Sequence, residues 1–378
     1  MSVFKTASGA APFNIAAAMS MVAARYGKSG WRQAIDVARH AFGPRRMDPK
    51  TYYLAALFRP ELTFDEKRAH VSYVSSDRVN IALTPKNTSL RLLIDNKLLT
   101  GNVLQAAGFP VLKALAYYSA RGGAPGVRSL DAAAMIADFL ASEGALPCFG
   151  KPVDGSLSIG GASYMAQNED GASVRLGDGR TFTRHEIAAQ IVQHFPRGYL
   201  FQPLIRQIPE IEALCGPAVG TFRVVTLWGS GAPEVLYTLQ KLPAKGAMMD
   251  ASDSTRSNGF ACVDPDSGVV TRAQLANRMN TEPLLLAPAT GAELLGVVVP
   301  NVAEAVEMCR QAHRLFPTHG ILGFDIANTT DGLIINEINA NPAHFLYQRS
   351  ADRGLLNPDF APRIAAVSAF MAKSNGRK

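Results

Sequence analysis

The chain has 378 residues, a formal net charge of +7 and a hydrophobic fraction of 47%. This length and apolar content predict a globular protein with two or three lobes. The four cysteines (Cys148, Cys215, Cys262 and Cys309) are widely spaced without a paired motif, which argues against a zinc site or a disulfide framework and fits a reducing, cytoplasmic compartment.

Residues 1–90 are predicted to form a mostly helical accessory region without recognisable chemistry. The apolar run from Asn14 to Ala24 is too short to cross a bilayer and is poorly suited to be a secretory signal, so we expect a packing helix. No other segment approaches the length of a membrane span. Three roles stay open for the region: a substrate-selecting lobe, a homodimer surface, or an adaptor to a partner enzyme.

Much of the positive charge lies near the N-terminus. A basic patch attracts nucleic acid, anionic lipid or polyanionic substrates, but it is more commonly a solvated helix face. Aromatic residues are not interleaved with these charges, so nucleic acid is not an expected partner. The basic residues are Arg25, Lys28, Arg32, Arg39, Arg45, Arg46 and Lys50.

Residues 91–205 are predicted to form a first lobe of helices and strands. Glycine-terminated and capped patterns predict helices over 96–108, 129–141 and 183–195, the last opened by a capping box. Strands are expected over 146–149 and 198–205. Helices and strands therefore mix in this lobe without a regular βαβ alternation.

A lysine and a glycine-rich loop follow the strand expected at 146–149. Lys151 precedes a loop from Gly155 to Gly161 in which glycine and hydroxyl residues let backbone N–H groups approach phosphate oxygens. Alone this is a weak signal, because such loops are commonly ordinary mobile loops and this one matches neither the Walker pattern nor the dinucleotide fingerprint.

Residues 206–378 are predicted to form a second lobe dominated by antiparallel hairpins. Alternation predicts strands over 221–228 and 234–241, in which Arg223 interrupts apolar neighbours. A helix over 301–316 then leads into a final hairpin. The resulting order of elements indicates an α+β fold.

The final hairpin gathers oxygen-bearing side chains on one face. A three-residue loop, Thr330 to Gly332, places Asp325 opposite Glu337, with Asn339 two residues further along the same face. The same register places Asn328 opposite Ile334, puts Ile334 on the core face, and leaves room at Gly323, opposite Asn339.

Two carboxylates directly across a strand pair repel each other unless a cation lies between them. Mg²⁺ suits this arrangement, because it binds through one or two carboxylates together with phosphate oxygens and water. The alternative is a surface hairpin with solvated acids. With the lysine and glycine loop upstream, the hairpin predicts a site for Mg²⁺ and ATP.

On these residues the chain resembles the ATP-grasp superfamily, and most closely its sugar-transfer-associated, alpha-L-glutamate ligase-like branch. The resemblance covers about residues 90–350 and implies an ATP-grasp fold in which two α+β lobes hold ATP between them. It is carried by Lys97, Lys151 with its glycine loop, the 201–205 strand, Thr221 to Arg223, Lys241, and the closing Asp325, Glu337 and Asn339.

The resemblance implies a role for each of these residues. Lys97 and Lys151 would contact the α- and β-phosphates, and Arg223 and Lys241 would be catalytic, balancing charge on the γ-phosphate and on an acyl-phosphate intermediate. Mg²⁺ would be held by Asp325, Glu337 and Asn339. The loop over the phosphates would be Gly155, Ser156, Ser158, Gly160 and Gly161, and the adenine edge would meet the backbone around Gln202 and Leu204.

Two positions depart from the family pattern. The glycine pair that precedes a short strand in the family appears here as Ser257-Asn258-Gly259, without its first glycine, and the glycine that commonly follows Asn-Pro is Ala343. His344 comes next and is either a substrate contact or, as is more common for a lone histidine after a turn, a packing residue.

The expected function is an ATP-dependent carboxylate–amine ligase that forms an amide bond and releases ADP and phosphate. Its partners would be an amine and a small-molecule carboxylate, for which acidic amino acids such as glutamate or aspartate are candidates. Two alternatives stay open. One is a phosphotransferase, for which a phosphorylated His344 would be essential, and the other is a low-turnover ATP-binding scaffold for polysaccharide or natural-product assembly.

Overall fold

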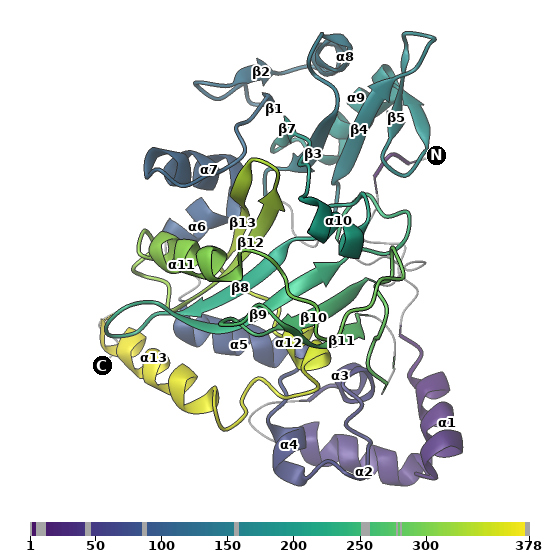
Figure 1. Ribbon diagram of the computed structural model, residues 1–378, viewed down its shortest axis with the longest axis vertical. Coiled ribbons are helices and arrows are strands. Elements are labelled where there is room, and N and C mark those ends of the chain that lie inside the picture. The colour runs from purple at the N-terminus through teal and green to yellow at the C-terminus, as the bar shows by residue number, and fades with distance from the viewer. Residues whose placement is uncertain are drawn as a thin grey trace.

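The computed structural model describes residues 2–4, 13–41, 47–84, 89–154, 159–250, 258–276, 279 and 282–374. They build two β-sheets, one above the other in Figure 1, with helices packed around both. The predicted α+β architecture with a helical N-terminal region is confirmed. No described helix is both long and apolar enough to cross a membrane.

The upper sheet of Figure 1 has seven strands in the order β2-β1-β7-β3-β4-β5-β6. Its neighbours pair antiparallel except β1 and β2, which are parallel. One core, formed with helices α8 and α9, stabilises this lobe. The strands are β1 (Ala116–Tyr118), β2 (Arg128–Leu130), β3 (Cys148–Pro152), β4 (Ala162–Gln167), β5 (Ser173–Leu176), β6 (Thr181–Thr183) and β7 (Tyr199–Pro203).

The lower sheet has six antiparallel strands in the order β11-β10-β9-β8-β12-β13. The predicted strand pair at 221–228 and 234–241 forms its centre as β8 and β9. The strands are β8 (Phe222–Leu227), β9 (Glu234–Leu242), β10 (Gly259–Val263), β11 (Val270–Leu275), β12 (Ile321–Thr329) and β13 (Gly332–Asn339).

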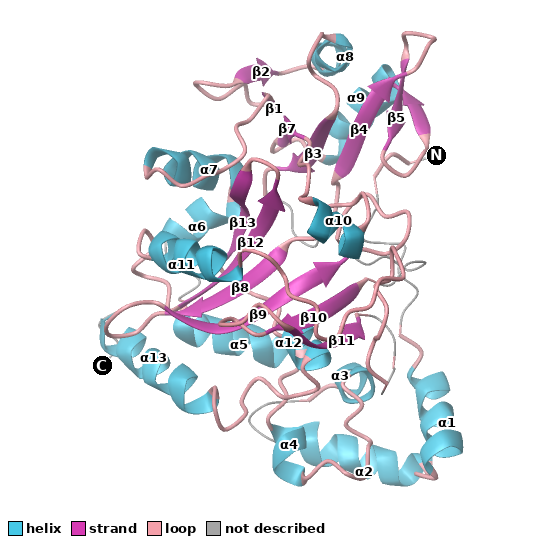
Figure 2. Ribbon diagram, in the orientation of Figure 1, coloured by secondary structure: helices cyan, strands magenta, loops and turns pink. Residues whose placement is uncertain are grey.

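Thirteen helices lie within the described residues (Figure 2). The predicted capping box at Thr183 and Glu186 opens α9, whereas the helix expected from Ser129 begins later, because Ser129 lies in β2. The helices are α1 (Ile15–Tyr26), α2 (Gly30–Ala41), α3 (Pro49–Leu54), α4 (Phe64–Arg68), α5 (Tyr73–Leu83), α6 (Ser89–Asp95), α7 (Lys97–Ala106), α8 (Ala133–Ala141), α9 (Arg184–His194), α10 (Pro209–Cys215), α11 (Val302–His313), α12 (Phe345–Ser350) and α13 (Ala361–Ser374).

Helices cover both faces of the lower sheet, which explains why β8 and β12 are buried along their whole length. Phe222 and Val224 contribute to the core formed with α10 and α11. Val225 and Leu227, beyond Val224 on the same strand, contribute to the core formed with α5, α12 and α13.

The N-terminal region packs as more than one unit. Helices α1 to α3 share a small core of their own, whereas α5 packs against α13 below the lower sheet (Figure 1). Val3 and Phe4 lie in the core of the upper lobe. The division of the chain at residues 90 and 205 stays a prediction, and α5 is the part of the first ninety residues that packs on the lower sheet.

The register of the final hairpin differs from the prediction near its turn. Thr329 pairs with Gly332, so the loop has two residues, and Asn328 faces Leu333 rather than Ile334. The extra residue that we expected in the turn lies instead in a bulge at Asn336. Beyond the bulge, Asp325 faces Glu337 as predicted.

The bulge also changes which isoleucine faces the core. Ile335 is buried and lies in the core with Ile338, whereas Ile334 is half-buried, so its predicted place on the core face is wrong. A one-residue shift of register moves a side chain to the opposite face of a strand. The bulge restores the predicted register on the side where the carboxylates lie.

Candidate nucleotide-binding site

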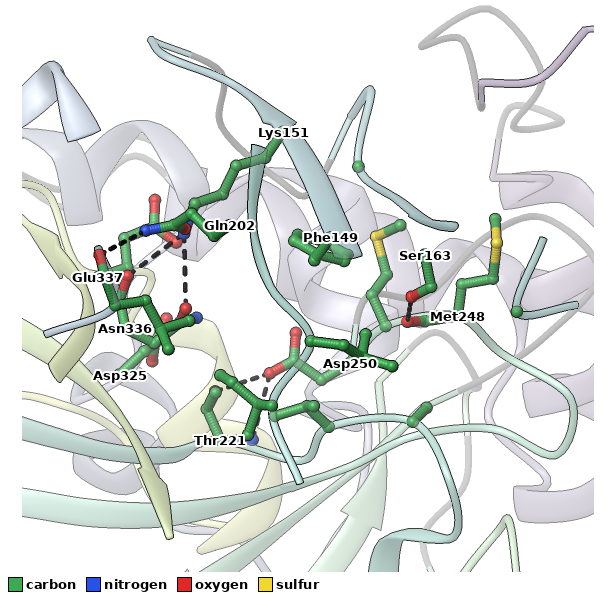
Figure 3. A pocket seen from close by; sticks show the side chains of 18 of the residues that line it. Phe149, Lys151, Ser163, Gln202, Thr221, Met248, Asp250, Asp325, Asn336 and Glu337 are labelled. Carbon is green, nitrogen blue, oxygen red and sulfur yellow. Dashed lines mark hydrogen bonds between the residues drawn. The ribbon is translucent and has the colours of Figure 1, made fainter. Parts of the chain in front are cut away.

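A cleft lies between the two sheets, with walls from both lobes. Counting the open space at its mouth, it encloses about 1130 Å³. Lys151 from β3 lies on one side of it, and Asp325 and Glu337 from the β12–β13 hairpin lie on the other (Figure 3). The cleft therefore brings cations of the upper lobe to carboxylates of the lower lobe.

Asp325 is the centre of a buried ion cluster on the lower sheet. Arg223 donates from Nε at 2.5 Å and from Nη2 at 2.8 Å to its two carboxylate oxygens, and Lys241 donates from Nζ at 3.0 Å. The residues come from adjacent strands, with Arg223 on β8 directly paired with Asp325 on β12. A bidentate arginine fixes both the position and the orientation of the carboxylate.

Burial and charge act in opposite directions on the pKa values of this cluster. Burial alone would raise the pKa of Asp325, but Arg223 and Lys241 more than offset it and hold that pKa well below its usual range. Burial lowers the pKa of Lys241, and the carboxylates of Asp250 and Asp325 turn the net shift upward. Asp325, Arg223 and Lys241 are therefore charged at neutral pH.

A second charged group joins the two lobes beside this cluster. Lys97, the first residue of α7, pairs with Glu337 at 3.3 Å between Nζ and Oε1. Lys151 donates to the backbone oxygen and to Oδ1 of Asn336, each at 3.4 Å. Burial lowers the pKa of Lys151 to about 8, so a buried lysine close to its titration point faces the space between the lobes.

The rest of the cleft is mainly apolar. Phe149, Met248 and Leu204 line it together with Ile159, Met165, Ile205, Pro217 and Met249. Gln202 donates to the backbone oxygen of Leu112 at 3.0 Å, while its buried Oε1 has no hydrogen-bond partner. A flat apolar group with a hydrogen-bond donor at its edge would satisfy this wall.

The residues predicted for the site are not all in the cleft. Gly160 packs against Phe195 instead of lining the cleft, and its backbone oxygen accepts from Tyr199 at 3.0 Å. Asn339 and Arg223 do not line the cleft, and Arg223 is linked to the cleft by its hydrogen bonds to Asp325. Lys97, Lys151, Gly161, Gln202, Leu204, Lys241, Asp325 and Glu337 line it. Gly155, Ser156, Ser158 and Ser257 lie outside the described residues.

Asp250 is a site residue that the sequence did not reveal. Its Oδ2 accepts from Thr221 Oγ1 at 2.6 Å and lies 3.2 Å from Lys241 Nζ, at the floor of the cleft (Figure 3). Asp250 follows β9 in an irregular segment, so no strand periodicity marked it. The one available signal was its position after the apolar pair Met248 and Met249, which also line the cleft.

Asp325 and Glu337 are the carboxylates that would serve Mg²⁺, although both oxygens of Asp325 already accept from Arg223 and Lys241. The described residues contain no group of three or more His, Cys, Asp or Glu side chains placed to hold a metal, so a site here needs an amide or phosphate oxygen beside the two carboxylates. Asn339 provides the amide, and its buried Nδ2 has no hydrogen-bond partner in the chain. The orientation of that amide is thus free to follow a ligand.

His344 is a packing residue. Its side chain is fully buried, Nδ1 lies 2.9 Å from Tyr237 Oη, and Nε2 lies 2.8 Å from Asn80 Oδ1. Burial lowers its pKa to about 3, so the ring is neutral. Neither ring nitrogen is available to a substrate in the cleft.

Two facing lobes, with lysines on one wall and a carboxylate hairpin on the other, define an ATP-grasp architecture. The sugar-transfer associated ATP-grasp family matches residues 78–360, which is most of the chain, and the protein belongs to this family. The match begins within α5, so part of the N-terminal helical region lies inside it.

Solved structures similar to this chain at low identity include an ATP-grasp ligase and two other ligases. The ligase PsnB complexed with minimal precursor is 15% identical, with a TM-score of 0.38 over 75% of this chain and 62% of that chain. The D-alanine-D-alanine ligase from Coxiella burnetii is 16% identical, with a TM-score of 0.40 over 75% and 60%. VanG D-Ala:D-Ser ligase from Enterococcus faecalis is 13% identical, with a TM-score of 0.43 over 74% and 62%.

The chain thus spans about three fifths of the length of these three ligases. At these identities and TM-scores the likenesses carry no argument about a substrate. Among the curated proteins there is no match.

Proposed function

We propose that the protein is an ATP-dependent carboxylate–amine ligase that acts through an acyl phosphate. The observation that supports this most is the arrangement of the cleft: Lys97 and Lys151 face the Asp325 and Glu337 pair, with Arg223 and Lys241 behind it. Such a site positions a nucleotide and neutralises charge, which is what phosphoryl transfer needs from a protein.

In the proposed reaction, a carboxylate oxygen of the donor acid attacks the γ-phosphorus of ATP. The bond between that phosphorus and the β,γ-bridging oxygen breaks, and ADP leaves. The amine nitrogen then attacks the acyl carbon, the bond from carbon to the phosphate oxygen breaks, and phosphate leaves with one oxygen of the former carboxylate. The nitrogen loses one proton as the amide forms.

Each residue of the cleft has a part in this proposal. Lys97 and Lys151 bind the α- and β-phosphates, and the wall of Phe149, Gln202 and Leu204 holds the adenine. Lys241 balances charge on the transferred phosphoryl group, and Arg223 keeps Asp325 in place. The groups that would hold Mg²⁺ are Asp325, Glu337 and Asn339, and the ion would supply charge stabilisation to the phosphate oxygens.

The substrates are a small carboxylic acid and an amine, with an acidic amino acid as the first candidate donor. Three lysines and three carboxylates line the cleft, and Arg223 behind them adds the one extra cation that supports an acidic donor. A phosphotransferase that uses a histidine is less well supported, because His344 is fully buried and both ring nitrogens are engaged.

The experiment is release of ADP and phosphate from MgATP, measured against pools of amino acids, other carboxylic acids and amines. Glu337→Gln is the control, because it removes one charge from a side chain that is 28% exposed. Substrate-dependent release that disappears in the variant supports the ligase. Tight ATP binding with no release stimulated by any pool would contradict it and favour a scaffold.

A further inference from the structure

A chain of polar groups, buried at its centre, connects α5 to the turn that follows β13. Its centre is Asn80 on α5, which is 1% exposed. Asn80 Oδ1 lies 2.8 Å from His344 Nε2, and Asn80 Nδ2 donates to Asn341 Oδ1 at 2.5 Å and to the backbone oxygen of Pro342 at 3.0 Å. In Figure 1, α5 lies below the lower sheet, beside α12.

The hydrogen-bond partners fix the orientation of every member. Asn80 Nδ2 has two protons, and both are used, so its Oδ1 must accept the proton of His344 Nε2. His344 Nδ1 then accepts from the hydroxyl of Tyr237, 2.9 Å away. Asn341 continues the chain, because its Nδ2 donates to Asp77 at 3.1 Å.

This turn and the ion cluster of the cleft both closely approach Gly323. A Cβ atom placed on Gly323 would lie 3.0 Å from Pro342 Cβ and 3.6 Å from both Cδ and Nη1 of Arg223. Pro342 and the Arg223 side chain therefore share the space above Gly323, which is paired with Asn339. Movement of Pro342 would change the packing around the Arg223 side chain where it extends toward Asp325.

We propose that Asn80 is a positioning residue of the cleft: it holds Pro342 and Asn341 in place, so that Arg223 keeps its two hydrogen bonds to Asp325. Its effect on catalysis rests on the proposed ligase function, whereas its effect on the geometry does not. The inference also assigns a role to the N-terminal helical region, since α5 supplies the residue that fixes the closing turn of the site.

Three variants separate positioning from simple stabilisation. Asn80→Ala removes the whole set of hydrogen bonds. Asn80→Asp keeps the shape and the acceptor for His344, but it turns an oxygen toward Asn341 Oδ1 and the Pro342 carbonyl. Leu83→Ala, a fully buried position on the same helix, is the matched control, because it weakens packing below the sheet without touching these bonds.

The first measurement is amide hydrogen exchange over residues 339–345 in the nucleotide-free protein. We expect both Asn80 variants to lose about tenfold or more of the protection there, as the turn opens locally more often, while Leu83→Ala keeps it. Unchanged exchange in Asn80→Asp overturns the proposal, whatever the protein does with ATP. Should Asn80→Ala not fold, Asn80→Asp carries the test.

The second measurement is MgATP-dependent turnover. A misplaced catalytic group costs up to about a hundredfold in rate, so we expect kcat to fall about 10- to 100-fold in both Asn80 variants and KM for ATP to change less than about threefold. Leu83→Ala should keep kcat within about twofold. Equal kcat in Asn80→Asp and the parent overturns the proposal, whereas no turnover in the parent would count against the ligase function alone.

Discussion

Asp325→Asn is expected to destabilise the lower sheet strongly, whereas Glu337→Gln is expected to change its stability little. Asp325 is 2% exposed and accepts from two cations. Its removal as an anion leaves Arg223 buried with a neutral partner and Lys241 with Asp250 alone, and breaking a buried pair in this way costs about 3–5 kcal/mol. Glu337 is partly exposed and faces one lysine at 3.3 Å, a pair typically worth about 0–1 kcal/mol.

The assay is urea unfolding followed by the fluorescence of Trp228, which packs against His313 beside the lower sheet. The chain has two tryptophans, so Trp31→Phe makes Trp228 the single reporter. We expect the midpoint to fall clearly for Asp325→Asn and to stay near the parent value for Glu337→Gln, with similar slopes. Equal midpoints for Asp325→Asn and the parent would refute the buried ion cluster.

The same pair gives a pH dependence with a defined sign. The pKa of Asp325 is lower in the folded than in the unfolded protein, so its stabilisation is present above the unfolded value of about 3.9 and is lost as the pH falls toward the folded value. Asp325→Asn should remove this part of the acid sensitivity. An identical loss of stability below about pH 4 in variant and parent would contradict the assignment.

Three further predictions concern single positions. Because burial lowers the pKa of Lys151 to about 8, ATP affinity measured by calorimetry should weaken by up to about tenfold per pH unit above pH 8. Lys151→Met should abolish this pH dependence, and an unchanged dependence in the variant would contradict a contact between Lys151 and ATP. Asp250→Asn should lower kcat about tenfold, because Lys241 loses one of its two anions, while the free energy of unfolding stays nearly unchanged. A kcat equal to that of the parent would contradict a role for Asp250 in the site. Gly160→Ala should lower the free energy of unfolding by about 1–3 kcal/mol, because its Cβ would lie 2.4 Å from Phe195 Cζ. Gly179→Ala is the control for backbone strain alone, since Gly179 has a similar positive φ and open space around it, and an equal loss of stability in both variants would refute the clash at Gly160.

The sequence was most informative where local chemistry decides the structure. The capping box at Thr183 needs only two side chains within one turn, and it is present. The pairing of Asp325 with Glu337 follows from alternation along two strands joined by a short loop. The family itself was evident from these closing residues together with the lysines upstream.

The sequence was least informative where distant segments meet. A turn of two residues followed by a bulge at Asn336 gives the same pairing at Asp325 as a turn of three residues, so counting residues did not separate them. Asp250 reaches the cleft from an irregular segment, and no periodicity marks it. The link from Asn80 to His344 spans 264 positions and depends on how α5 packs, which no local pattern encodes.

The central claim is that a carboxylate is activated by phosphorylation before the amine attacks. The most direct test uses the acid that stimulates ADP release, labelled with ¹⁸O in its carboxylate, and follows the label by mass spectrometry of the released phosphate. An acyl-phosphate route predicts one ¹⁸O atom in each phosphate that is released. Unlabelled phosphate, or a phosphoryl group found on a hydroxyl of the product, would contradict the ligase mechanism.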